Sequence, residues 1–158
     1  MMAHASPHQS LQEELNLITC MIDMMKQEQQ FLVAADTEAL GALTPLKLQL
    51  IDQMAHLAGK RHAALAADGF AATETGMEGW LVRMAHPGIH SLWQQLLEKT
   101  REAKELNRVN GMLVNKQLGH TETLITAMRT PAGAADQPFY GPSGQSAPLT
   151  GKRRLVIG

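Results

Sequence analysis

The stretch from Ile89 to Met128 most constrains the fold, because it contains no proline and repeats one side-chain pattern throughout. At 1.5 Å per residue, an uninterrupted helix of this length is a rod of about 60 Å. Residues spaced three and four apart form one face of it: Leu92, Leu96, Lys99, Ala103, Leu106, Asn110, Leu113, Gln117, His120, Leu124 and Ala127. Four of these eleven positions are polar, so the face cannot be buried along its whole length. We expect the helix beyond about Leu113 to be loosely packed until a partner orders it.

A second long helix is predicted near the N-terminus. Ser6 and Pro7 offer a capping hydroxyl followed by a proline at the first helical position, which predicts a start near Ser6. The spacing alternates between four and three residues along Leu11, Leu15, Ile18, Ile22, Met25, Gln29 and Leu32. This pattern predicts a coiled-coil-like seam with one polar interruption.

Further helices are predicted in the middle of the chain. Asp36 opens a short helical turn through Leu40, and Thr44-Pro45 resembles a fresh cap and first helical position. The apolar face of the helix that starts there is expected to contain Leu46 or Lys47, then Leu50, Met54, Leu57 and Leu65.

A loop and a short helix should follow. Residues 66–75 lack periodicity, and Thr75 to Glu78 fit a capping box. The short helix would carry a stripe of Met77, Leu81 and Met84, and Pro87-Gly88 would end it.

The composition agrees with helices packed on helices. The chain is 44% hydrophobic but only 4% aromatic, and Leu, Ala and ten Met residues supply most of its apolar volume. From Thr130 onward, four prolines accompany several Gly and Ser residues, which cannot continue a helix. We therefore predict an all-α fold: an antiparallel three-helix, coiled-coil-like bundle with a short extra helix over residues 1–129, and a disordered Pro/Gly-rich tail over residues 130–158.

The net charge and the cysteine content indicate which cellular compartment and which classes of partner the protein can have. The formal net charge of −1 gives no attraction toward nucleic acid. The single cysteine, Cys20, excludes an internal disulfide and agrees with a reducing compartment. The first residues resemble no signal peptide, and no apolar run reaches the roughly 20 residues of a membrane span. A cytoplasmic protein without an integral membrane segment is expected.

Candidate catalytic and metal sites are weak. The Glu-x-x-His pairs of di-iron bundles are absent from the sequence. Asp52 and His56 have helical spacing but read more simply as an exposed polar pair, and Pro87-Gly88 separates His86 from His90. Cys20 is predicted to lie off the apolar seam. We predict no enzyme activity, no cofactor and no metal.

The segment Leu106-Asn107-Arg108-Val109-Asn110-Gly111-Met112-Leu113-Val114, placed on a long final helix, resembles the signature of the FlgN family of flagellar type III export chaperones. The order of parts is also similar: a long first helix, residues 35–40 leading into a second helix, a variable middle and the long last helix. The tail around residues 140–145 and 153–155 is similar to many family tails, whereas the closing residues 156–158 are less typical.

This resemblance implies a cytoplasmic chaperone for the hook-associated (hook–filament junction) proteins FlgK and FlgL. Such a protein would prevent their premature assembly and deliver them to the flagellar export apparatus. The family associates partner binding with the C-terminal region, which suggests these anchors: Leu106, Leu113, Leu118, Leu124, Met128, Phe139 and Tyr140. Leu106 and Leu113 are the ones most expected to pack in the core instead, and Asn110 is expected to be a buried polar residue that sets helix register.

Three other functions remain open from the sequence. A sister flagellar chaperone for the filament cap protein is the nearest alternative. A generic coiled-coil adaptor, as a homo-oligomer (a dimer built on the N-terminal seam), is ranked above it as the runner-up. A metal-dependent bundle enzyme is the weakest.

Overall fold

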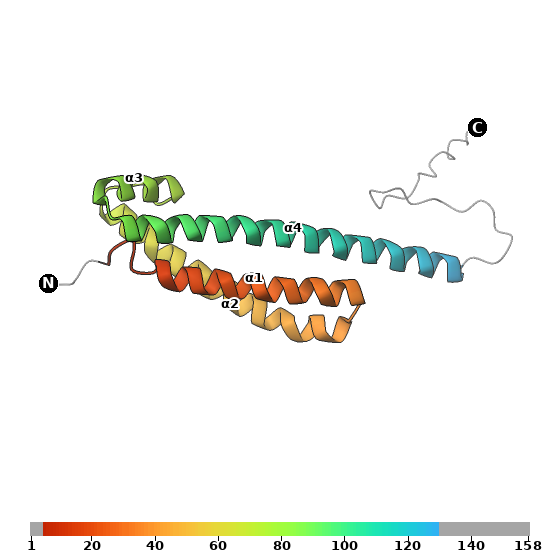
Figure 1. Ribbon diagram of the computed structural model, residues 1–158. Coiled ribbons are helices and arrows are strands. Elements are labelled where there is room, and N and C mark those ends of the chain that lie inside the picture. The colour runs from red at the N-terminus through yellow and green to blue at the C-terminus, as the bar shows by residue number, and fades with distance from the viewer. Residues whose placement is uncertain (1–4, 130–158) are drawn as a thin grey trace, which may run out of the picture. The chain divides into compact units, whose positions relative to one another are not determined.

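The computed structural model describes residues 5–129, and these residues are all-α with no strand among them. Four helices follow in order: α1 (Leu11–Ala34), α2 (Thr37–Ala67), α3 (Glu74–Met84) and α4 (Pro87–Arg129) (Figure 1). The chain divides into two units, Met1–Leu113 and Val114–Gly158. The predicted tail, residues 130–158, lies outside the described residues.

Helix α1 begins at Leu11, five residues later than the Ser6 start that the sequence suggested. Ser6 does not cap a helix, because its Oγ lies 2.8 Å from Nδ1 of His8. The N–H groups of Gln9 and Leu11 donate to the carbonyl oxygens of Ser6 and His8, which makes residues 7–10 a separate turn. Pro7 is fully buried in this turn, so its role is packing rather than helix initiation.

Helix α2 is one continuous helix, and the prediction of a new start at Thr44-Pro45 was wrong. Asp36 is the cap, since its Oδ1 accepts a hydrogen bond from the N–H of Ala39 at 3.0 Å. Thr44 instead donates its hydroxyl to the carbonyl oxygen of Leu40 at 2.9 Å, a bond made inside a helix. Pro45 deprives the carbonyl of Gly41 of its helical partner, but Gly41 is exposed, so water can satisfy that carbonyl.

Helix α3 begins at Glu74, capped by Thr73 rather than by Thr75 as predicted. The Thr73 Oγ1 accepts a hydrogen bond from the N–H of Gly76 at 3.2 Å. The chain passes so close to itself here that a Cβ on Gly76 would lie 1.8 Å from the carbonyl oxygen of Ala71, so only glycine fits. This close approach fixes where the helix starts.

The buried face of α3 also differs from the predicted stripe. Met77 and Leu81 are buried as expected, but Met84 is 48% exposed and Trp80 takes its place in the core. The indole N–H of Trp80 donates to Oδ2 of Asp68 at 3.1 Å, which satisfies the polar end of a buried aromatic ring.

Pro87 begins α4 instead of ending α3. The chain turns at Ala85, whose positive φ of 48° ends α3, and Pro87 then occupies the first helical position, where its missing N–H costs nothing. The N–H of Ile89 donates to Nδ1 of His86 at 3.2 Å and so caps the new helix. Helix α4 thus extends a little beyond both predicted ends.

Two polar clusters establish the directions of the helices in the first unit. At one level, Glu14 of α1 forms an ion pair with Arg61 of α2, whose guanidinium lies 4.9 Å from the ring centroid of Trp93 in α4. At the other level, Glu28 of α1 contacts Lys47 of α2 and Asn110 of α4. Between the levels residue numbers rise along α1 and α4 and fall along α2, so α2 is antiparallel to the other two helices.

The core confirms most of the predicted apolar seams. All six apolar positions of the α1 seam are buried, with Met21 beside them. On α2 the predicted choice between Leu46 and Lys47 is settled, since Leu46 is 52% exposed and Lys47 is half-buried. On α4 the fully buried positions include Leu96, Ala103 and Asn110, each seven residues apart, as in a coiled coil.

Candidate partner-binding surface

The last part of α4 carries a stripe of exposed apolar side chains, which we name the α4 stripe. It consists of Val114, Leu118, Leu124, Ile125 and Met128, whose exposed fractions range from 40% to 82%. At 3.6 residues per turn, these five positions fall within an arc of about 120° on one side of the helix. An exposed helix with one apolar face is typical of a surface that receives another helix.

Two polar residues lie within this arc, the half-buried Gln117 and the exposed Thr121. Thr121 donates its hydroxyl to the carbonyl oxygen of Gln117 at 2.9 Å, so its one hydrogen-bond donor is used within the helix. Thr123, on another side, donates in the same way to Gly119. The charged residues of 114–129 are Lys116, Glu122 and Arg129, and none of them falls within the arc.

The predicted partner-binding residues are found in different environments. Leu106 is half-buried and packs against the core of the first unit, and Leu113 is also half-buried. Leu118, Leu124 and Met128 are exposed and belong to the α4 stripe. Phe139 and Tyr140 lie outside the described residues.

Sequence reasoning missed two members of the stripe, Val114 and Ile125. The predicted face of the helix runs through Gln117, His120 and Leu124. The exposed apolar face lies one residue later in the sequence, at Val114, Leu118, Ile125 and Met128. The signal was present in the spacing of four, seven and three residues between these positions. A prediction that assumes one continuous apolar face along the whole helix does not include these two residues.

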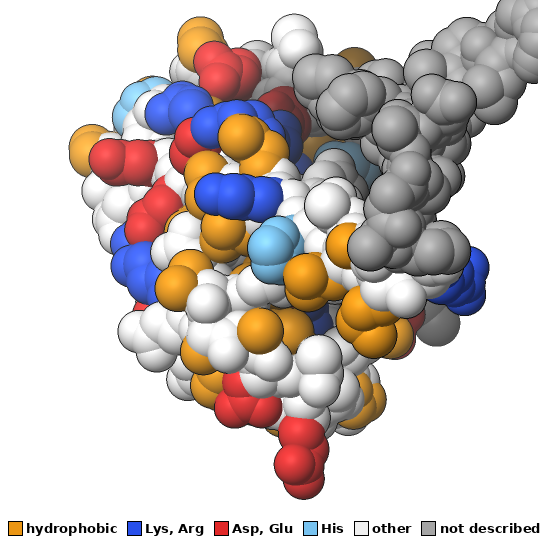
Figure 2. All heavy atoms as spheres, turned by 90° about the vertical axis from the view of Figure 1, so that its right-hand side faces the viewer, with side chains coloured by type: hydrophobic (Ala, Val, Ile, Leu, Met, Phe, Trp, Pro, Cys, Tyr) orange, Lys and Arg blue, Asp and Glu red, His pale blue; other side chains and the backbone are white. Residues whose placement is uncertain are grey.

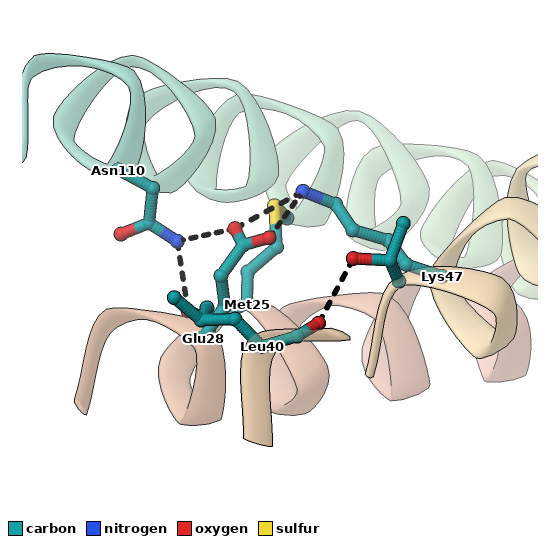
Figure 3. A network of polar contacts seen from close by, with 6 residues as sticks. Met25, Glu28, Leu40, Lys47 and Asn110 are labelled. Atoms are coloured by element: carbon teal, nitrogen blue, oxygen red, sulfur yellow. Dashed lines mark hydrogen bonds and ion pairs between the residues drawn. The ribbon is translucent and has the colours of Figure 1, made fainter. Parts of the chain in front are cut away.

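A buried polar network holds α4 against α1 shortly before the stripe (Figure 3). Asn110 is 2% exposed, and its amide group donates to the carbonyl oxygen of Met25 at 2.9 Å and to Oε1 of Glu28 at 2.8 Å. Lys47 donates to both carboxylate oxygens of Glu28, at 3.0 and 2.9 Å. The prediction that Asn110 is a buried polar residue is confirmed, and its two donated bonds join α4 to α1 at Met25 and Glu28.

Charged pairs line the exposed side of α4 within the first unit. Burial of the Glu102 carboxyl opposes its ionisation, but Lys99 and Lys26 outweigh this and lower the pKa of Glu102. A hydrogen bond from Arg108 likewise lowers the pKa of Glu105, and the pKa of Arg108 is raised in return. In the space-filling view, acidic and basic side chains are interspersed on the described surface, so neither sign of charge dominates that face (Figure 2). Apolar contacts rather than net charge are therefore available to select a partner.

Residues 5–129 contain no group of three or more His, Cys, Asp or Glu side chains arranged to hold a metal ion. None of the four helices is long and apolar enough to cross a bilayer. Cys20 is exposed, off the buried seam, as the pattern predicted.

The buried ion pair between Glu14 and Arg61 joins helix α1 to helix α2. Arg61 donates through Nε and Nη2 to the Glu14 carboxylate at distances of 3.0 to 3.3 Å, and Ser10 donates its hydroxyl to the same carboxylate at 2.8 Å. Each side chain is 7% exposed, so the two charges neutralise one another away from water.

Comparison with known proteins assigns the chain to a family. No curated protein and no solved structure matches it. The family model described as FlgN protein matches residues 1–148, which is nearly the whole chain and includes the α4 stripe. The bundle and its long last helix also agree with the resemblance seen in residues 106–114. The chain therefore belongs to the FlgN family of flagellar export chaperones.

Proposed function

We propose that this protein is a cytoplasmic chaperone that binds the hook–filament junction proteins FlgK and FlgL and delivers them to the flagellar export apparatus. Family membership supports the export role. The observation that supports binding by this chain is the α4 stripe, an apolar face of a helix that the described residues leave exposed. While bound, the client's aggregation-prone terminal segments would be shielded from premature assembly.

The chemistry of the stripe suits an amphipathic client helix. Its exposed side chains recur at the spacings at which a helix in a groove presents its anchors. Burying a Leu, Ile or Met side chain completely contributes roughly 1.5–3 kcal/mol, and the five members of the stripe are already partly covered. Association itself costs about 4–15 kcal/mol, so the stripe alone is insufficient and the client must bury an apolar face of its own.

A pull-down with purified FlgK and FlgL from the same organism tests this proposal. Met128→Asp should weaken capture of the client at least tenfold, because a carboxylate would be forced against the client's apolar face. Val82→Asp is a matched control, since Val82 is 81% exposed on α3 and Met128 is 82% exposed. Circular dichroism should show both variants as helical as the parent chain.

Two results would contradict the proposal. Equal loss of capture in both variants would mean that added charge, rather than the stripe, weakens binding. Absence of binding by the intact, folded chain would favour a generic helical adaptor, and capture of the filament cap protein instead would favour the sister chaperone.

A truncation and hydrogen exchange refine the location of the site. The 1–129 chain tests whether the tail, with Phe139 and Tyr140, contributes to capture. Backbone amides of residues 114–129 should exchange rapidly in the free chain and become protected in the complex. Uniform protection in both states would show that this part of α4 is not ordered by a client.

A further inference from the structure

The α4 stripe belongs to the second unit of the chain, Val114–Gly158, which also contains residues 130–158. The five side chains of the stripe are exposed, and apolar surface in contact with water favours association with other apolar groups. The longest run of large apolar residues beyond Arg129 is Leu155-Val156-Ile157. This run lies outside the described residues and beyond the family match over residues 1–148, so family membership assigns it no role.

The connection between Arg129 and Leu155 has a suitable length for this run to reach the stripe. At 1.5 Å per residue, Leu118 and Val114 lie about 17 and 23 Å back along the helix axis from Arg129. A connection of about 25 residues without regular structure has a root-mean-square end-to-end distance of about 25–30 Å. Because the two lengths are similar, the effective concentration of the run at the stripe is near its maximum, on the order of millimolar.

The charges beside the stripe and beside the run are complementary. Glu122 is the one acidic side chain of residues 114–129, and Leu118 and Ile125 neighbour it on the helix surface at spacings of four and three residues. No ion pair within the described residues involves Glu122. The sequence Lys-Arg-Arg at 152–154 immediately precedes Leu155, so docking of the run on Leu118 and Ile125 brings positive charge to Glu122.

The other apolar pair beyond Arg129, Phe139-Tyr140, is less suited to this part of the stripe. Asp136 precedes this pair by three residues, and no Lys or Arg is present between residues 130 and 151. Docking of Phe139-Tyr140 beside Glu122 would therefore bring a second negative charge to it, which opposes binding. The charges favour the run at 155–157 as the occupant.

We propose that Leu155-Val156-Ile157 docks on the α4 stripe of its own chain in the unliganded protein, and that a ligand of the stripe must displace it. An anchor of about ten carbon atoms binds with a dissociation constant on the order of millimolar. Because the effective concentration is also on the order of millimolar, the docked and open states have similar populations. Docking is independent of the proposed function, whereas competition with an export client rests on it.

The methionine methyl groups of the full-length chain can report on docking. Met128 is the most exposed member of the stripe, and in a chain labelled with ¹³C-methyl methionine the substitution Met128→Leu assigns its signal. The double substitution Leu155→Asp and Ile157→Asp should move the Met128 signal, because the docked state is lost. The Met112 signal should stay in place, since Met112 lies on the opposite side of α4.

Two controls separate docking from added charge and from self-association. The double substitution Ala147→Asp and Thr150→Asp adds the same charge to the same part of the chain and should leave the Met128 signal unchanged. Tenfold dilution of the parent should also leave it unchanged, because docking within one chain does not depend on concentration.

Titration calorimetry with purified FlgK measures the competition. The chain with Leu155→Asp and Ile157→Asp should bind FlgK about two- to fivefold more tightly than the parent, because its stripe is always open. If the Met128 signal moves but FlgK binds both chains equally, docking is supported and competition is overturned. If FlgK binds neither chain, the proposed function fails while the Met128 result still decides docking.

Other results would overturn docking itself. An unchanged Met128 signal in the Leu155 and Ile157 double variant, or an equal change in the charge control, would show that the run does not cover the stripe. A signal that moves on dilution would assign the cover to a second copy of the chain. A response to Phe139→Asp without a response to the Leu155 and Ile157 substitutions would assign the cover to Phe139-Tyr140.

Discussion

Helix α4 contains two regions of similar sequence pattern and opposite environment. Up to Leu113 its inward positions are covered by α1 and α2, and Leu96 is 7% exposed. Within residues 114–129 every large apolar side chain is exposed, and Leu124 is 51% exposed. Leu96 and Leu124 are the same residue type and are separated by a whole number of heptads in the sequence.

The difference shows what a heptad pattern determines and what it leaves open. Spacing decides which residues share a face of the helix. Whether that face is covered depends on the length and placement of other elements, and the pattern of a single helix does not contain that information. A face that a chain leaves uncovered at heptad spacing is therefore a candidate for a partner rather than a defect of packing.

The largest expected effect comes from truncating the same side chain in both regions. Leu96→Ala should lower the free energy of unfolding by about 2–5 kcal/mol, because it removes buried methyl groups and leaves a cavity. Leu124→Ala should change it by less than about 0.5 kcal/mol, because the side chain is half exposed. Urea unfolding of both variants measures the contrast. Similar losses in the two would mean that Leu124 belongs to a packed core.

A smaller loss of stability is expected from breaking the polar network around Asn110, near the end of the buried part of α4. Asn110→Ala removes both donated hydrogen bonds and leaves Glu28 half-buried with one partner fewer, which should cost about 1–3 kcal/mol. Asn115→Ala, at an exposed position on the same helix, should cost less than about 0.5 kcal/mol. Thermal unfolding distinguishes the two, and equal melting temperatures would show that the Asn110 bonds contribute nothing net.

Much of the first unit could be predicted because its seams are regular. The α1 positions from Leu11 to Leu32 follow one spacing and face one core, so pattern and packing agree. A prediction from the sequence failed where the rest of the helix outweighed the local preference of one residue. Pro45 suggested a helix start, but Asp36 caps the chain earlier and an exposed Gly41 makes the proline tolerable.

The candidate surface could be predicted only in part. The polar intrusions in the last helix indicated loss of cover after Leu113, and the large apolar side chains of residues 114–129 are exposed. Leu118, Leu124 and Met128 were predicted as anchors from the family resemblance. Val114 and Ile125 were missed because the apolar line shifts by one residue there. The ion pair between Glu14 and Arg61 could not be predicted from the sequence. The two residues are 47 positions apart, and no repeating pattern connects them.

The smallest expected effect concerns the charged pairs of the covered region. The hydrogen bond from Arg108 lowers the pKa of Glu105 below its ordinary value of 4.5, so folding favours the ionised carboxylate. This contribution is fully present above pH 4.5 and is lost as the pH falls through the lowered pKa of the folded chain. Glu105→Gln should therefore be slightly less stable than the parent at pH 7, and the difference should narrow as the pH falls below 4.5 toward 3.

Glu122→Gln extends this test into the region of the stripe. No ion pair within residues 5–129 involves Glu122, so the same change there should alter the stability at pH 7 less than Glu105→Gln does. Urea unfolding midpoints at the two pH values provide the measurement. The Glu105 difference should also shrink in 1 M salt, because both partners are exposed and their attraction is screened. A Glu105→Gln difference that persisted at pH 3 and in salt would have to come from packing of the side chain rather than from its charge.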